Sequence, residues 1–332
     1  MKAASIDTQG PPENLTYGDL PDPQPAENEV IVRMASSSVN PIDTYIRSGA
    51  VRAELPKPWI PGCDVAGTVE SVGAAVSRFQ PGDRVWASNQ SLFGRQGTLA
   101  EFVSVQEQWL YPTPDGVSDD AVAAAALVGI TAHLGLYLHA GLKADDVVFV
   151  NGGTGGVGSS VVQIASVAGA TVLTTVGSDE KVTAATELGA AAAINYQTED
   201  VQQRLTELTE EHGKISLWFE TLRNASPETT FPHLRKRGRY VLMAGRDARP
   251  EFPVGTFYVN DLRAFGFAMF NASADEQRQS AEHLNQLLAD GQLTPLIGAR
   301  FGLSEAAAAH ALQEQNTLQG AGTLSGKIIV TP

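Results

Sequence analysis

The chain changes its hydrophobic pattern near residue 120. Before that point, short apolar or alternating runs such as Val30–Val32, Gly67–Val72 and Phe102–Val105 are separated by turns that contain proline and glycine. Runs of this length between turn signals predict a twisted, barrel-like β unit. After that point, the segment Ala121–Ala140 is rich in alanine and leucine and lacks proline, which predicts a helix.

Strands and helices then alternate through the middle of the chain. Val147–Val150 is an apolar run typical of a strand that is buried on both faces. The same reasoning predicts strands at Thr171–Val176, Ile194, Ser216–Phe219 and Tyr240–Met243, with helices over Ser159–Ala168, Asp179–Leu188, Glu199–Glu210 and Pro227–Lys236. Repeated βαβ units predict a parallel sheet with right-handed crossovers.

The last part of the chain predicts an amphipathic helix over Asp275–Ala289 and a closing strand over Lys327–Val330. The pattern therefore predicts an α/β protein in which a β-rich domain contains an inserted, doubly wound domain. We assign residues 1–122 to the first part of the β-rich domain, residues 123–266 to the inserted domain, and residues 267–332 to the second part of the β-rich domain.

Composition narrows the class of protein. The chain has 332 residues, 43% hydrophobic and 18% charged, which is typical of a soluble globular protein of about two domains. With 23 basic and 37 acidic residues the net charge is −14, so we expect no nucleic acid partner. The single cysteine, Cys63, excludes an internal disulfide. The apolar run Ala121–Ile130 is too short to span a bilayer, and the first ten residues are polar. We therefore expect a cytoplasmic protein that has no membrane partner.

The segment Gly153–Gly158 has the spacing G-x-G-x-x-G. It directly follows a predicted strand and opens a predicted helix, which is the context in which this motif binds a dinucleotide. Its glycines permit a tight turn and let the backbone approach a pyrophosphate at the helix N-terminus. The alternative is a glycine-rich turn that binds nothing.

The end of the next predicted strand indicates which dinucleotide this site would bind. NAD-specific sites carry an acidic residue there to bind the ribose 2′-hydroxyl, but Thr171–Val176 is followed by Gly177 and Ser178. The acidic pair Asp179–Glu180 comes later, and Lys181 follows it. The missing acid and the nearby lysine favour a 2′-phosphate and hence NADPH. The alternative for Lys181 is an ordinary exposed helix lysine.

The sequence lacks the motifs that several other kinds of active site require. The six histidines form no paired-ligand motif, and there is no serine nucleophile elbow and no nucleoside triphosphate loop. The basic run Arg235–Arg237, with Arg239, is interpreted as a set of cations at the C-terminus of the helix predicted over Pro227–Lys236.

Several longer motifs allow a family comparison. Val39–Gly49, Pro61–Gly67, Gly82–Trp86, Gly152–Gly158 and Gly326–Lys327 resemble the quinone oxidoreductase (zeta-crystallin-like) branch of the zinc-independent medium-chain dehydrogenase/reductase superfamily. The resemblance runs nearly from end to end. It implies a GroES-like catalytic domain, a Rossmann domain inserted in it, bound NADPH and a homodimer.

The resemblance also implies the residues of the site. Tyr45 lies beside the nicotinamide, and the other cofactor-binding positions are Thr131, Thr154, Gly155, Gly156, Val157, Gly177, Ser178, Lys181, Tyr196, Asn224, Gly245, Arg246, Ala268, Met269 and Phe270. The segment Phe219–Leu222 departs from the family pattern and leaves the contacts of Asn224 open. Zinc-dependent members have a cysteine at the position of Asn40 and a histidine at that of Cys63, so we expect no zinc.

The activity that the resemblance implies is the transfer of a hydride from NADPH to a quinone. The Tyr45 hydroxyl and the Asn40 amide are candidates for stabilising the oxyanion. The alternatives are that Tyr45 is a wall of the site and that Asn40 only ties down the turn at Pro41. Two other functions stay open at this point: NADPH-dependent reduction of 2-alkenals or enones, and a non-catalytic NADPH-binding protein with a structural or regulatory role.

Overall fold

Two β-sheets of different kinds organise the chain, one in each of two units. The computed structural model describes residues 1–332. Unit 1 comprises Met1–Leu127, Ser273–Gly291 and Pro295–Pro332, and unit 2 comprises Val128–Ala272 and Gln292–Thr294. The second unit is thus inserted between segments of the first, as the hydrophobic pattern predicts.

The main sheet of unit 1 has seven strands in the order β14-β15-β3-β4-β5-β7, and β6 also pairs with β3. Its strands are β3 (Glu29–Val39), β4 (Asp64–Val72), β5 (Arg84–Ala87), β6 (Phe102–Gln106), β7 (Leu110–Pro112), β14 (Ile297–Gly302) and β15 (Lys327–Thr331). A separate pair consists of β1 (Lys2–Ser5) and β2 (Thr16–Asp19). Most neighbours are antiparallel, and β15 places Ile328 opposite Val39 of β3.

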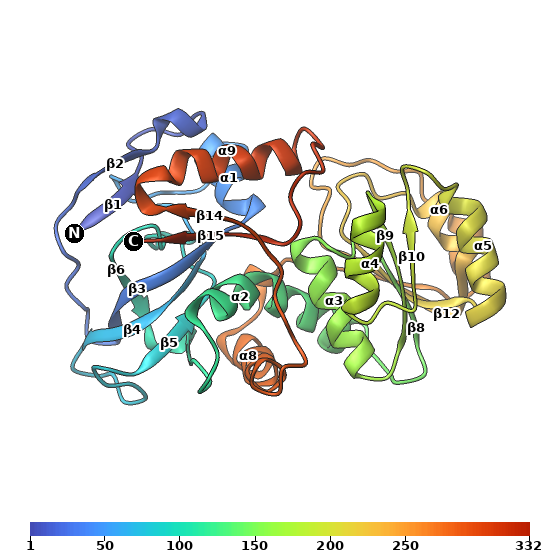
Figure 1. The fold of residues 1–332 in the computed structure, drawn as a ribbon, viewed down its shortest axis with the longest axis horizontal. Coiled ribbons are helices and arrows are strands. Elements are labelled where there is room, and N and C mark those ends of the chain that lie inside the picture. The colour runs from blue at the N-terminus through green and yellow to red at the C-terminus, as the bar shows by residue number, and fades with distance from the viewer. The chain divides into compact units, whose positions relative to one another are not determined.

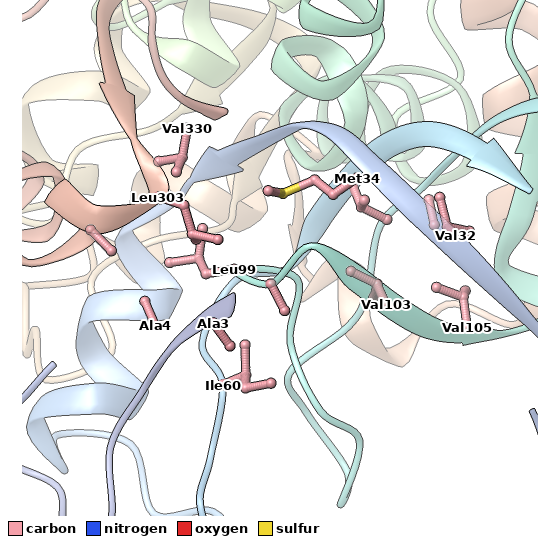
Figure 2. Packing of buried hydrophobic residues seen from close by; sticks show 14 of the residues in the cluster. Ala3, Ala4, Val32, Met34, Ile60, Leu99, Val103, Val105, Leu303 and Val330 are labelled. Carbon is pink, nitrogen blue, oxygen red and sulfur yellow. The ribbon is translucent and has the colours of Figure 1, made fainter. Parts of the chain in front are cut away.

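The core of unit 1 draws side chains from both ends of the chain. Figure 2 shows Ala3 and Ala4 from the first strand, Val32 and Met34 from β3, and Leu303 and Val330 from the C-terminal part, all members of one buried cluster with Leu99. Each large aliphatic side chain buried in this way contributes about 1.5–3 kcal/mol to folding. The packing makes the C-terminal segment part of the first unit.

Three helices lie wholly in unit 1: α1 (Pro41–Ser48), α8 (Ala274–Ala289) and α9 (Ala306–Thr317). Helix α1 begins at Pro41, where the missing N–H is not needed, and ends at Gly49, whose φ of 84° suits glycine. Helix α8 begins with a capping box between Ser273 and Glu276. Short 3₁₀ turns lie at Pro12–Asn14, Glu107–Trp109 and Leu303–Glu305.

Unit 2 is a doubly wound α/β domain. Its six strands are all parallel and lie in the order β10-β9-β8-β11-β12-β13 (Figure 1, where β8, β9, β10 and β12 are labelled). They are β8 (Val147–Val150), β9 (Thr171–Val176), β10 (Ala192–Asn195), β11 (Ile215–Glu220), β12 (Leu234–Leu242) and β13 (Arg263–Gly266). The strand order reverses between β8 and β11, which makes that pair the switch point of the sheet.

The helices of unit 2 follow the predicted alternation. They are α3 (Gly156–Val167), α4 (Asp179–Glu187), α5 (Val201–His212), α6 (Pro227–Thr230) and α7 (Val254–Val259), with 3₁₀ turns at Phe231–His233 and Met269–Asn271. The helix predicted over Pro227–Lys236 is wrong in its second half, because α6 ends at Thr230 and β12 begins at Leu234. Pro232 lacks the N–H that a continuing helix needs and clashes with the preceding turn.

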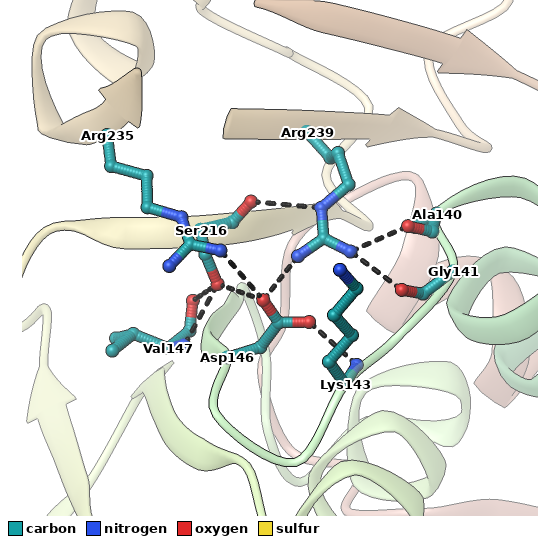
Figure 3. A network of polar contacts seen from close by, with 8 residues as sticks. All are labelled: Ala140, Gly141, Lys143, Asp146, Val147, Ser216, Arg235 and Arg239. Atoms are coloured by element: carbon teal, nitrogen blue, oxygen red, sulfur yellow. Dashed lines mark hydrogen bonds and ion pairs between the residues drawn. The ribbon is translucent and has the colours of Figure 1, made fainter. Parts of the chain in front are cut away.

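The basic run Arg235–Arg239 therefore lies on a strand and not at a helix end. Arg235 and Arg239 both pair with the buried carboxylate of Asp146, at 3.3 Å for Arg235 (Figure 3). Arg239 also donates to the carbonyls of Ala140 and Gly141 at 2.7 and 2.9 Å. The Ser216 hydroxyl donates to Asp146 at 2.7 Å. This network joins the N-terminal ends of β8, β11 and β12.

The alanine-rich helix is longer than its most apolar run suggests. Helix α2 (Asp119–His133) continues as a π-helix over Leu134–His139, so the helical stretch has 21 residues. By length and composition it could cross a membrane, but 78% of its most apolar stretch is buried inside the protein, as in the core helix of a soluble protein.

Candidate functional site

The G-x-G-x-x-G segment forms a tight loop between β8 and α3. Gly152 has a φ of 69°, and a Cβ on Gly158 would lie 2.1 Å from the Gly152 carbonyl oxygen. A Cβ on Gly153 would lie 2.4 Å from the Thr174 hydroxyl oxygen. These contacts leave no room for side chains, so the loop can close only with glycine. Gly155 is the N-cap residue and Gly156 the first residue of α3, so the loop presents backbone amides at a helix N-terminus.

A second group of predicted cofactor residues meets at the end of β9. A Cβ on Gly177 would lie 2.5 Å from the Tyr196 hydroxyl oxygen, so the tyrosine ring passes directly over this glycine. The Ser178 hydroxyl caps α4 by accepting the Lys181 backbone N–H at 3.3 Å. The structure thus brings together Gly177, Ser178, Lys181 and Tyr196.

No carboxylate takes the place of the missing ribose acid at this strand end. The Asp179 carboxylate accepts the side-chain N–H of Asn195 at 2.7 Å, which ties it to the end of β10. The backbone N–H of Glu180 and the Ser178 hydroxyl hold the pKa of the exposed Glu180 below its usual range. The arrangement is compatible with the 2′-phosphate that the sequence predicts.

The remaining predicted cofactor residues of unit 2 follow other strands of the same sheet. Asn224 is exposed after β11, Gly245 and Arg246 follow β12, and Ala268–Phe270 follow β13. Gly245 has a φ of 84°. Since all these strands are parallel, their carboxyl ends share one edge, which is where doubly wound sheets bind ligands. Thr131 is buried on α2, and Thr154 is buried within the glycine loop.

In the sequence, Glu220 stands out only as part of the segment Phe219–Leu222, which departs from the family pattern. The carboxylate ends β11, is 2% exposed, and accepts the side-chain N–H of Asn151 at 2.9 Å and the backbone N–H of Leu222 at 2.8 Å. Its other oxygen accepts the Trp218 indole N–H at 3.2 Å. Burial raises its pKa, and the donated hydrogen bonds oppose that rise. The signal that could have found it is an acid in an otherwise apolar central strand.

Asn151 connects this carboxylate to the glycine loop. The Thr175 hydroxyl donates to the Asn151 side-chain oxygen at 3.2 Å and accepts the Gly152 backbone N–H at 3.2 Å. The Gly153 N–H binds the Thr175 carbonyl at 3.0 Å. The loop is therefore held from behind by side chains at the ends of β8, β9 and β11.

In unit 1, Asn40 lies in a fully buried polar cluster. Its side-chain N–H groups donate to Asp64 at 2.7 Å and to the Ser38 carbonyl at 3.5 Å, and its side-chain oxygen accepts the Lys327 ammonium. Its backbone N–H donates to Asp43 at 2.8 Å. Both ends of the amide are thus taken up inside the protein. This geometry favours the alternative interpretation, in which Asn40 fixes the start of α1, over the prediction that it donates to a substrate.

The cluster gathers opposing charges away from water. Burial raises the pKa of Asp43 to about 7 and also raises that of Asp64, whereas burial lowers the pKa of Lys327. Burial and the two carboxylates hold the pKa of the Cys63 thiol well above its usual range. Cys63 is therefore a neutral thiol at physiological pH.

Tyr45 stands on α1 and is less buried than its neighbours. Thr44, Ile46 and Arg47 are buried, whereas Tyr45 is half-buried. The helix is anchored on its buried side, where Arg47 donates to the Gly10 carbonyl and pairs with Glu314 of α9. The exposed part of α1 is thus a fixed platform for the Tyr45 ring.

Two family models match successive parts of the chain. Residues 26–115 match the alcohol dehydrogenase GroES-like domain, and residues 156–288 match the zinc-binding dehydrogenase domain. The chain is 30% identical to human quinone oxidoreductase over 331 residues, covering 99% of this chain and 97% of that protein. The chain belongs to the quinone oxidoreductase branch of the medium-chain dehydrogenase/reductase superfamily. It is therefore an oxidoreductase, as the resemblance implies.

Relatives in bacteria agree with this placement. The chain is 32% identical to a quinone oxidoreductase of Pseudomonas aeruginosa over 312 residues, covering 91% of this chain and 92% of that protein. Its fold matches the structure of Escherichia coli quinone oxidoreductase complexed with NADPH, with a TM-score of 0.87, 26% identity and full coverage of both chains. The GroES-like and Rossmann architecture predicted from the sequence is confirmed.

The family raises the question of zinc, which the buried cluster of unit 1 does not fit. A catalytic zinc takes three protein ligands from thiolate, imidazole and carboxylate groups. Here Asn40 is an engaged neutral amide, Cys63 is a buried neutral thiol, and the Lys327 ammonium lies in the same cluster as a cation. No group of three or more histidine, cysteine, aspartate or glutamate side chains could hold a metal ion.

A dinucleotide does fit the edge of unit 2. The loop over Gly152–Gly158 is a backbone cradle that side chains would fill, and it opens at the N-terminus of α3. Lys181 supplies a cation beside the strand end that lacks an acid. These residues would hold the pyrophosphate and the adenosine end of NADPH.

Proposed function

We propose that the protein is a cytoplasmic, NADPH-dependent quinone reductase that works without zinc. The observation that carries the proposal is the edge of unit 2, where a glycine cradle and Lys181 meet a strand end that carries no ribose-binding acid. Its relatives named as quinone oxidoreductases support the choice of substrate.

NADPH supplies the hydride when it is bound. The chain's own part is to hold the reactants and to stabilise charge on the substrate oxygen. The backbone amides of the glycine loop bind the pyrophosphate, Lys181 pairs with the 2′-phosphate, and the segment Ala268–Phe270 borders the nicotinamide. The Tyr45 hydroxyl donates a hydrogen bond to the oxygen of the quinone as negative charge develops there. A quinone needs little polarisation, because its reduction makes the ring aromatic.

The test is NADPH oxidation against a panel of quinones and a matched panel of enones and 2-alkenals. We expect larger kcat/KM values for the quinones. Faster turnover of the alkenals would indicate C=C reduction on the same scaffold. Tight NADPH binding without turnover of either panel would indicate a structural or regulatory protein.

A separate measurement tests whether the enzyme works without zinc. Because the cluster around Asn40 and Lys327 does not fit zinc, we expect metal analysis to find no stoichiometric zinc. Treatment with a chelator should leave the NADPH oxidation rate unchanged. One zinc per chain, with activity lost on its removal, would contradict this part of the proposal.

We also propose that the enzyme is a homodimer. Strand β13 is paired with β12 on one side only, and the preceding helix α7 exposes Val254, Tyr258 and Val259 to 63%, 68% and 61%. An open strand edge beside exposed apolar side chains favours pairing with a second copy. Light scattering should give about twice the chain mass of 35.1 kDa, and Tyr258→Glu should lower it.

A further inference from the structure

Glu220 places a buried carboxylate at the point where the sheet of unit 2 reverses its strand order. It ends β11, and its partner Asn151 directly follows β8, so their 2.9 Å hydrogen bond crosses the switch point. Doubly wound sheets bind dinucleotides outside the carboxyl ends of the strands at this point. The carboxylate therefore lies directly behind the proposed cofactor site.

The hydrogen bonds to Glu220 favour its ionised form and oppose the rise in its pKa that burial causes. Asn151, Trp218 and Leu222 all donate to it, and donated bonds stabilise the ionised form of a carboxylate. All three partners are also neutral, so they stabilise the carboxylate by hydrogen bonds alone, and none of them forms an ion pair with it. A charge in such a site acts over a longer distance than a charge in water.

We propose that the negative charge of Glu220 favours the oxidised dinucleotide over the reduced one in the bound state. The inference rests on the proposed function, since it needs the dinucleotide to bind at this edge. The oxidised nicotinamide carries one more positive charge than the reduced form, so a fixed anion nearby binds it more tightly. A stabilised oxidised form makes the bound reduced cofactor a stronger hydride donor.

The test compares the affinities of the two redox forms in matched variants. Glu220→Gln alone would point an amide N–H at the Trp218 indole N–H, so we use Trp218→Phe as the parent and add Glu220→Gln to it. Calorimetric titration with NADPH and with NADP⁺ gives the ratio of their dissociation constants. We expect the added Glu220→Gln change to weaken NADP⁺ relative to NADPH by about fivefold. For a two-electron couple this ratio corresponds to about 20 mV.

Three controls separate charge from structure. Glu220→Asp keeps the charge, so the ratio should stay at the parent value even where both affinities fall. Asn151→Ala cuts the link to the glycine loop and should weaken both nucleotides equally. Glu210→Gln removes a charge from the exposed face of α5 and should change neither affinity.

The outcomes distinguish this inference from the proposed function. Equal weakening of both nucleotides by Glu220→Gln would show that the carboxylate is only structural and would overturn the inference. Failure of the unmodified protein to bind either nucleotide would overturn the proposed function itself. If the double variant does not fold, the single Glu220→Gln variant is titrated instead, because its N–H to N–H contact with Trp218 would weaken both nucleotides alike and leave their ratio to report the charge. Thermal unfolding monitors the fold of each variant.

Discussion

Two buried ionisable residues of unit 1 respond to pH in opposite directions. His310 of α9 is fully buried, and neither of its ring nitrogens has a hydrogen-bond partner in the protein. Burial and the nearby Arg47 lower its pKa to about 3, whereas burial raises the pKa of Asp43 to about 7. Asp43 therefore stabilises the fold below pH 4 and loses that contribution as the pH rises to about 7. His310 does the reverse.

His310→Leu should make the protein relatively more stable in acid. Between pH 6.5 and about 3 the unfolded histidine binds a proton that the native one does not, so this residue destabilises the unmodified protein as the pH falls. The leucine variant lacks that penalty. Urea unfolding at pH 7 and pH 5 should show a relative gain of about 2 kcal/mol for the variant. Asp43 is present in both proteins, so its effect cancels, and parallel pH curves would contradict the prediction.

Lys181→Ala should discriminate between the two dinucleotides. A charge-assisted contact with a 2′-phosphate contributes ~1.5–3 kcal/mol, so the variant should bind NADPH about tenfold or more weakly and NADH nearly unchanged. Fluorescence titration measures both constants. Lys236→Ala removes the same charge from an exposed position on β12 and serves as the control. Equal loss for both cofactors would mean that Lys181 only supports the fold.

Tyr45→Phe should lower turnover with little change in NADPH affinity. A bond that strengthens in the transition state affects kcat more than binding. Loss of one donor in an oxyanion hole can cost ~10²–10³-fold, and we expect less for a quinone because it is already activated. Assays on a quinone and an enone test the role, and the loss should be larger on the enone. If the rates on both substrates are unchanged, Tyr45 contributes shape alone.

At the scale of elements, β12 shows how a distant partner decides what a local pattern becomes. The run Arg235–Arg239 is polar enough to suggest an exposed helix end, but Asp146 lies buried at the start of β8 and draws two of its arginines to the sheet. Local periodicity carries no information about a partner 93 residues away. The strand is therefore held in the sheet by an ion pair that cannot be predicted from the sequence of the strand alone.

Arg239→Met should destabilise unit 2 strongly. Removing one partner of a buried ion pair costs about 3–5 kcal/mol, because the remaining charge stays buried. Arg235 compensates in part, as it pairs with the same carboxylate. Lys236→Met on the exposed side of the same strand is the matched control and should change the unfolding free energy by less than about 0.5 kcal/mol. Similar losses for both variants in urea unfolding would contradict the assigned network.

At the scale of the whole molecule, the sequence predicts the architecture better than the site. Strands such as Val147–Val150 and turns such as Gly153–Gly158 are local patterns, and their alternation with helices predicts the parallel sheet of unit 2. The surroundings of Glu220 and Lys327 depend on contacts between segments that lie far apart in the chain. That is why Asn40 could be predicted as a position of interest but not as an amide with both ends already engaged.

The insertion of unit 2 has a consequence for synthesis on the ribosome. Asn40 meets Lys327 only after 287 further residues have been added, whereas the main segment of unit 2, Val128–Ala272, is continuous. At about 5–20 residues per second, the nascent chain waits roughly 15–60 s with the β15 side of β3 uncovered. Unit 2 can therefore fold before unit 1 is complete. Chaperones that shield unpaired strand edges during translation should raise the yield of native protein.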